Sequence, residues 1–180
     1  SRTHGIMNFP ANFMLVAALN PCPCGYYGSA EKECSCSPFQ IRKYLSKISG
    51  PLLDRLDIHL EVPALKVSEI VQDWPQDGQV SADIRKRVEQ AREIQKERLL
   101  PFGIYTNSRM NSKMIRKFCP VSADAKSILK KAIEKLGLSA RSYDKILKVA
   151  RTIADLAGCS ELKVEHISEA IQYRCLDRLI

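Results

Sequence analysis

The sequence has no apolar run close to twenty residues, the length that an α-helix needs to cross a bilayer. Its first ten residues, SRTHGIMNFP, lack the charged head and the hydrophobic core of a signal peptide. Internal repeats and low-complexity segments are also missing. These absences argue against membrane, secreted and repeat proteins, and they predict a globular protein of the cytoplasm without a membrane partner.

Charge of one sign is in excess. The chain has 28 Lys or Arg and 20 Asp or Glu, a formal net charge of +8. Residues 81–151 alone hold eighteen basic and seven acidic residues, so the excess lies in that region. Such an excess of positive charge indicates an acidic partner, which can be nucleic acid, a nucleotide phosphate or an anionic surface. A solvated basic surface without a partner is the other interpretation.

Four of the seven cysteines form two Cys-x-Cys pairs separated by nine residues: Cys22, Cys24, Cys34 and Cys36. Four thiolates can surround one tetrahedral cation, and sulfur ligands favour zinc or an iron-sulfur cluster. Clustered thiols in a reducing compartment bind metal more often than they form disulfides. We therefore expect structural Zn²⁺, while metal-free surface thiols and a disulfide pair remain alternatives. The isolated Cys119, Cys159 and Cys175 are predicted to be small core residues.

The first part of the chain has strand patterns. Residues 12–20 are apolar without alternation, which is typical of a strand buried on both faces. Residues 56–63 alternate between apolar and polar, which predicts a half-exposed strand. Between them, residues 37–50 have helical spacing and predict one helix. This order predicts two strands separated by one helix, with the cysteine loop at 22–36 between the first strand and that helix.

The rest of the chain has helical patterns. Residues 81–100 predict a long amphipathic helix whose apolar stripe is Ile84, Val88, Ala91 and Ile94. Three further helices are expected over residues 122–137, 139–158 and 164–178. We therefore expect a linker and long helix at 66–106, followed by an all-α bundle at 107–180.

Three segments carry a family resemblance: FPANFMLVAALNPCPCGYYG, SGPLLDRLDIHLEV and LSARSYDKILKVARTIADL. In this order they resemble the magnesium-chelatase-like AAA+ ATPases, in the branch of competence protein ComM, and the resemblance covers nearly the entire chain. It implies that residues 1–65 are the C-terminal part of an AAA+ α/β core, with a sensor-1 strand, a finger helix and an edge strand. It also implies that residues 107–180 form a helical lid of the magnesium chelatase C-terminal type.

The same resemblance implies roles for three residues. Asn20 would be sensor 1, Arg55 the arginine finger, and Arg141 the sensor-2 arginine on an ATP phosphate. Phosphoryl transfer needs groups that position the nucleotide and neutralise developing charge, and guanidinium groups suit this task. Other interpretations are open: Asn20 can simply end a strand, and Arg55 can pair with Asp54 or Asp57. Arg141 lies in a first helical turn, where the helix dipole disfavours a cation and a bound phosphate would supply a reason.

The sequence has no G-x-x-x-x-G-K-[ST] phosphate loop and no apolar strand ending in Asp-Glu to hold Mg²⁺. We therefore expect the C-terminal piece of a longer ATPase, which does not hydrolyse ATP by itself. ATP and Mg²⁺ would belong to the full-length protein, which would form a ring, typically a hexamer, and remodel DNA.

Three other interpretations of the sequence remain open. The first is a freestanding zinc-knuckle module that binds nucleic acid. A second is the ATPase subunit of a porphyrin magnesium chelatase, and a third is a protein-interaction domain with unliganded thiols.

Overall fold

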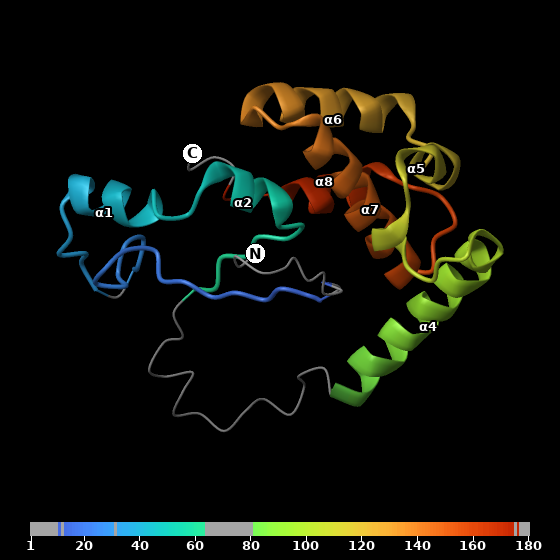
Figure 1. Cartoon of the computed structure of the whole chain (residues 1–180), viewed down its shortest axis with the longest axis horizontal. Coiled ribbons are helices and arrows are strands. Elements are labelled where there is room, and N and C mark those ends of the chain that lie inside the picture. Colours follow the sequence, from blue (N-terminus) through green and yellow to red (C-terminus); the bar gives the residue numbers. More distant parts are fainter. Residues whose placement is uncertain (1–10, 12, 31, 64–80, 175, 177–180) are drawn as a thin grey trace, which may run out of the picture. The chain divides into compact units, whose positions relative to one another are not determined.

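The structure, a computed structural model, describes residues 11, 13–30, 32–63, 81–174 and 176 (Figure 1). The chain divides into two compact units, Ser1–Lys47 and Ile48–Ile180, and each is described by itself. Residues 64–80, which hold most of the predicted linker, lie outside the described residues. The predicted domain limits remain a prediction.

The first unit ends in one helix, α1 (Pro38–Leu45). Ser37 caps it, because its Oγ accepts a hydrogen bond from the Gln40 backbone N at 3.3 Å. The Gln40 side chain returns the bond by accepting from the Ser37 N at 2.8 Å, which completes a capping box. Pro38 then fits the first turn, where its missing N–H costs nothing.

The helix predicted over residues 37–50 is present but shorter, and a second helix, which was not predicted, follows it. α1 ends at Leu45, and a separate helix, α2 (Gly50–Arg55), begins the second unit's helical structure. Pro51 explains the break, because a proline is tolerated in the first turn of a helix and disrupts its interior. As a result, Arg55 is the last residue of a short helix of its own.

The two segments predicted as strands are not assigned as strands in the described part of the chain. Asn12 lies outside the described residues, and residues 13–20 expose Phe13, Val16 and other apolar side chains, up to 86% at Met14. In the second segment Val62 is 87% exposed. A strand needs a neighbouring strand for its backbone hydrogen bonds, and among the described residues neither segment is paired with one. In the second segment the His59 N donates instead to the carbonyl oxygen of Tyr173, just after the last helix, at 2.7 Å. The α/β part of the predicted fold is therefore not confirmed.

The second unit is helical, as expected for the C-terminal region (Figure 1). After α2 its helices are α4 (Ser81–Leu99), η1 (Leu100–Phe102), η2 (Asn107–Arg109), α5 (Ser112–Phe118), α6 (Ala123–Leu136), α7 (Ala140–Leu156) and α8 (Val164–Gln172). α7 packs against α4, α5 and α8, while α6 packs against α8. None of the described helices is long and apolar enough to span a membrane. The short elements η1, η2 and α5 were not predicted.

The predicted caps of α6 and α7 are confirmed. Ser122 Oγ accepts from the Ala125 N at 3.3 Å, and Ser139 Oγ accepts from the Ser142 N at 3.2 Å. Gly137 ends α6 with φ of 62°, a left-handed conformation that glycine adopts without strain. These caps fix where α6 ends and where α7 begins.

The core lies around α7 and includes Leu129, Ile146, Leu147, Ala150 and Ile167, all nearly inaccessible. Cys119 is buried in this core as predicted. Cys159 is half-buried and packs against it, and Cys175 lies outside the described residues.

The apolar stripe predicted for α4 is only partly buried. Ala91 is buried, but Ile84, Val88 and Ile94 remain 46%, 43% and 37% exposed. The other buried residues of α4 are Gln95 and Leu99 near its C-terminal end. Only the second half of α4 therefore packs on the bundle.

Candidate metal centre and arginine sites

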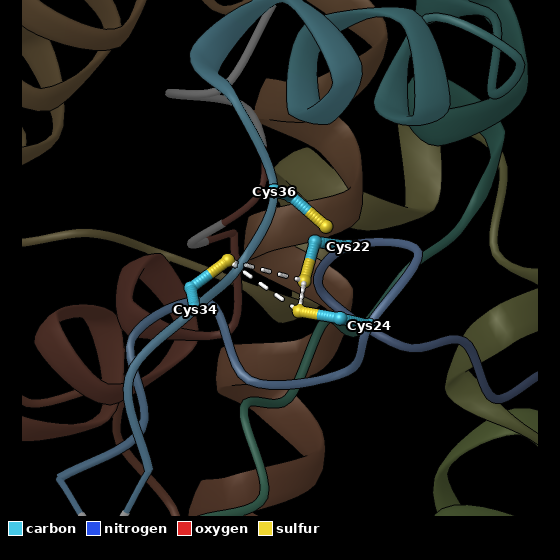
Figure 2. A group of neighbouring side chains, drawn as sticks. All are labelled: Cys22, Cys24, Cys34 and Cys36. Atoms are coloured by element: carbon cyan, nitrogen blue, oxygen red, sulfur yellow. Dashed lines mark hydrogen bonds between the residues drawn. The ribbon is translucent and has the colours of Figure 1, made fainter.

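Figure 2 shows the four clustered cysteines with their sulfur atoms turned toward one another. Cys22 Sγ lies 3.3 Å from Cys24 Sγ and 3.7 Å from Cys34 Sγ, and Cys24 Sγ lies 3.5 Å from Cys34 Sγ. All four sulfur atoms lie within 4.8 Å of one another. A zinc–sulfur bond of about 2.3 Å places tetrahedral thiolates about 3.8 Å apart. The donor set and its spacing therefore fit one zinc-sized cation.

Two tight turns bring the cysteine pairs together. The Gly25 N donates to the Cys22 carbonyl oxygen at 3.0 Å, and the Ser29 N donates to the Tyr26 carbonyl oxygen at 3.0 Å. Gly25 adopts φ of 85°, a conformation that would strain other residues. The second pair ends at Cys36, directly before the Ser37 cap, so α1 anchors that side of the loop.

The thiols influence one another electrostatically. The backbone N–H of Tyr26 lowers the pKa of Cys24 to about 5. For Cys34, the backbone N–H of Cys36 favours the thiolate, but desolvation and the neighbouring thiols outweigh it and raise its pKa to about 12. Four thiolates without a cation would repel one another. The positive charge of a divalent cation offsets this repulsion, so that all four thiols can lose their protons and coordinate it.

Asn20 lies beside the cysteine loop in the first unit. It ends the apolar segment 13–20, and its side chain is exposed. Its Cγ lies 4.0 Å from the position that a Cβ on Gly25 would occupy. The predicted sensor 1 is therefore next to the first turn of the loop.

Arg55 is exposed at the C-terminal end of α2. Its Nη1 donates to the Pro51 carbonyl oxygen at 2.7 Å. The acids near it have other partners: Asp54 accepts from two serines, and Asp57 pairs with Lys145 at 3.0 Å. Among the described residues, Arg55 therefore forms no ion pair, and its charge is not neutralised by its sequence neighbours.

Arg141 is exposed in the first turn of α7, between the cap residue Ser139 and the buried Ser142. The first turn of α7 contains no acidic residue. Within the part of the chain that the structure describes, its guanidinium group has no hydrogen-bond or ion-pair partner. A helix N-terminus and an exposed arginine both attract anions, so this turn suits a phosphate.

Sequence reasoning missed the residues that connect α2 with α7. Asp54 Oδ1 accepts hydrogen bonds from Ser139 Oγ at 2.9 Å and from Ser142 Oγ at 2.8 Å. Lys145 also donates to the carbonyl oxygen of Arg55. The signal for Ser142 was its place three residues after a predicted N-cap, whereas the role of Asp54 depends on a contact 88 residues away.

Comparison with known proteins identifies two family matches. Residues 78–174 match the family described as magnesium chelatase, subunit ChlI C-terminal, and residues 1–70 match magnesium chelatase, subunit ChlI. The chain is 43% identical over 180 residues to competence protein ComM of Haemophilus influenzae and 39% identical over 180 residues to the uncharacterized protein YifB of Escherichia coli. It is 37% identical over 175 residues to the uncharacterized protein Rv2897c of Mycobacterium tuberculosis. These alignments cover 97–100% of the chain but only 34% of each relative, so the chain spans about a third of their length.

Proposed function

Because the chain belongs to the magnesium chelatase ChlI family, in its ComM branch, we propose that it is the sensor, arginine-finger and lid portion of an AAA+ ATPase. The observation that carries this proposal is the exposure of two arginine side chains without ion-pair partners among the described residues. Arg55 and Arg141 are both exposed, and neither forms an ion pair with the described residues. Guanidinium groups presented in this way can neutralise charge on the phosphates of a nucleotide.

The roles follow the chemistry of phosphoryl transfer. Arg55 would reach the nucleotide of a neighbouring subunit as the arginine finger, and Arg141 would bind an ATP phosphate as sensor 2. Asn20 would be sensor 1, placing a polar side chain beside the γ-phosphate. The groups that grip ATP and Mg²⁺ would belong to the remainder of the full-length protein, so this chain alone would not hydrolyse ATP.

The exposed apolar segments support an α/β core completed by the rest of the protein. Residues 13–20 expose apolar side chains such as Met14 and Val16, and residues 58–62 expose Leu60 and Val62. Extended apolar segments of this kind are expected to pair with other strands of a sheet. We assign residues 1–65 to this core, 66–106 to a linker and long helix, and 107–180 to the lid.

The cysteine cluster is proposed to hold structural zinc. Cys22, Cys24, Cys34 and Cys36 would be its four ligands, and a site filled by four thiolates has no open position for catalysis. The metal would fix the loop that follows Asn20. The proposed compartment is the cytoplasm, where reducing conditions keep thiols available to a metal.

The substrate is proposed to be a macromolecule, and DNA is the favoured class. The support is the positive charge of residues 81–151 together with the similarity to a protein named for competence. A trans-acting finger needs head-to-tail contacts between subunits, which close into a ring. The proposed assembly is therefore a ring, with six subunits as the expected number for this superfamily.

ATP hydrolysis by the full-length protein tests the proposal. Arg55→Ala should lower kcat by about 10³-fold or more, the effect expected for loss of an arginine finger. Arg141→Ala should lower kcat/KM. Arg116→Ala, which removes another exposed arginine on α5, is the matched control and should keep the wild-type rate. Equal rates for Arg55→Ala and the control would contradict the proposal.

A further inference from the structure

One carboxylate attaches α2 to the start of α7. Asp54 precedes Arg55, and its Oδ1 accepts hydrogen bonds from both Ser142 Oγ and Ser139 Oγ, at 2.8 and 2.9 Å. The hydrogen bond from Ser142 is the main reason that the pKa of Asp54 lies below its ordinary value. Hydrogen bonds to an ionised carboxylate are stronger than those between neutral groups. We call Asp54, Ser139 and Ser142 the clasp.

Cations support the clasp at the end of α2. Lys145 on α7 donates to the carbonyl oxygen of Arg55 and pairs with Asp57 at 3.0 Å. Arg174, which is 1% exposed, donates to the carbonyl oxygen of Leu56. The last carbonyls of a helix have no partner within the helix and carry the negative end of its dipole. Lys145 of α7 and Arg174, which follows α8, therefore fix the C-terminal end of α2 in place.

The clasp lies between the two proposed phosphate-binding arginines. Arg55 directly follows Asp54, and Arg141 directly precedes Ser142. Adjacent Cα atoms are about 3.8 Å apart, so each arginine is one residue away from a member of the clasp. Both arginine side chains are exposed, and both belong to the unit Ile48–Ile180. The clasp thus connects the backbone that carries one arginine to the backbone that carries the other.

We propose that Asp54 is a positioning residue that holds α2 on α7 and thereby keeps Arg55 in a fixed relation to Arg141. This inference rests on the proposed function, since it concerns how the two guanidinium groups meet a nucleotide. Asp54 acts through Arg55 and does not touch the nucleotide. A helix of six residues is too short to be stable without such contacts, so loss of the clasp would release the finger to many orientations.

Steady-state ATPase kinetics of the full-length protein test the role of Asp54. Asp54→Ala should lower kcat by at least about tenfold, because a displacement of about 1 Å in a catalytic group can cost about 100-fold in rate. KM should change by less than about twofold, since the ground-state binding groups are untouched. Asp54→Asn keeps an oxygen that can accept from the serines, so its loss of kcat should be smaller.

The matched control removes a similar bond elsewhere on α7. Ser112 Oγ donates to Asp144 Oδ2 at 2.8 Å, and this bond connects α5, not α2, to α7. Asp144→Ala should keep the wild-type kcat. Folding of each variant is checked by circular dichroism, and Asp54→Asn carries the test if Asp54→Ala does not fold.

The outcomes separate this inference from the proposed function. If the wild type is active, Arg55→Ala is inactive and both Asp54 variants keep the wild-type kcat, the role of Asp54 is overturned and the proposed function stands. An equal loss of kcat in Asp144→Ala would also overturn the role of Asp54, because the loss would then reflect general weakening. A full-length protein without ATPase activity, or one that is unaffected by Arg55→Ala, would overturn both.

Discussion

Arg98 near the end of α4 forms a bidentate ion pair with Asp155 on α7. Its Nη1 donates to Oδ1 at 2.9 Å and its Nη2 donates to Oδ2 at 2.5 Å. Arg151 adds a third bond to the same carboxylate, from Nε at 3.1 Å, and the Asn107 amide adds a fourth at 2.8 Å. The Asp155 side chain is inaccessible to solvent. One buried carboxylate therefore forms ion pairs with two arginines and connects α4, η2 and α7.

Replacement of Asp155 should destabilise the bundle strongly. Asp155→Ala leaves Arg98 and the buried Arg151 without their counter-charge, and breaking a buried ion pair in this way costs about 3–5 kcal/mol. Asp155→Asn keeps the shape of the side chain and should cost less. The free energy of unfolding, measured by urea denaturation, checks both variants.

An exposed acid serves as the control for Asp155. Glu134 pairs with Lys130 at 3.8 Å on the surface of α6, and such pairs contribute about 0.5 kcal/mol or less. Glu134→Ala should therefore unfold at nearly the wild-type urea concentration. Similar losses for Asp155→Ala and Glu134→Ala would show that the buried network does not stabilise the bundle.

Removal of metal should act locally. The protein purified without chelators should contain about one zinc ion per chain, and the double change Cys22→Ser and Cys34→Ser should abolish it. The thermal unfolding of the bundle should hardly change, because its core cluster contains none of the four clustered cysteines. Elemental analysis and circular dichroism measure the two effects.

Cys119 provides the reciprocal control for the metal site. It is 3% exposed in the core of the bundle, so Cys119→Ser should lower the thermal midpoint and leave the zinc content unchanged. Absence of zinc and of iron from the wild type, with all thiols free to react, would contradict the metal site.

The clasp should weaken in acid. The pKa of Asp54 in the folded protein is lowered, first by the hydrogen bond from Ser142, then by the hydrogen bond from Ser139 and the charges of Arg174 and Lys145. Its carboxylate therefore contributes stability above the unfolded pKa of about 3.9, and this contribution is lost as the pH falls through the lower folded value. The stability difference between wild type and Asp54→Asn should be constant from about pH 5 to 7 and shrink below about pH 4. A difference that grows on acidification would have the wrong sign for this account.

Local patterns predicted the bundle well because its signals lie within a few residues. The Ser122 and Ser139 caps and the Gly137 stop gave the limits of α6 and the start of α7. Gly50 and Pro51 also gave a local signal for the end of the helix predicted over residues 37–50, but not for the earlier end of α1 at Leu45 or for the short helix α2 that begins at Gly50.

Features that depend on distant partners could not be predicted. Gln95 and Asn107 are polar residues of a type that is usually exposed, yet both are buried. The Asn107 N donates to the Gln95 side chain, and the Asn107 amide donates to Asp155. The exposure of Ile84 on α4 likewise depends on which residues pack against that helix. The close approach of the four thiols was suggested by their spacing, whereas nothing in the sequence indicated that Asp54 bonds to Ser139 and Ser142.

The most direct measurement mixes two inactive forms of the full-length protein. One form carries Arg55→Ala and keeps its nucleotide site; the other is altered in the phosphate loop expected upstream and keeps Arg55. If Arg55 completes the nucleotide site of the neighbouring subunit, a randomly mixed ring contains active interfaces. About one interface in four then places an intact nucleotide site beside an intact Arg55. The account predicts that the mixture recovers about a quarter of the wild-type ATPase activity. A mixture no more active than either form alone would contradict it.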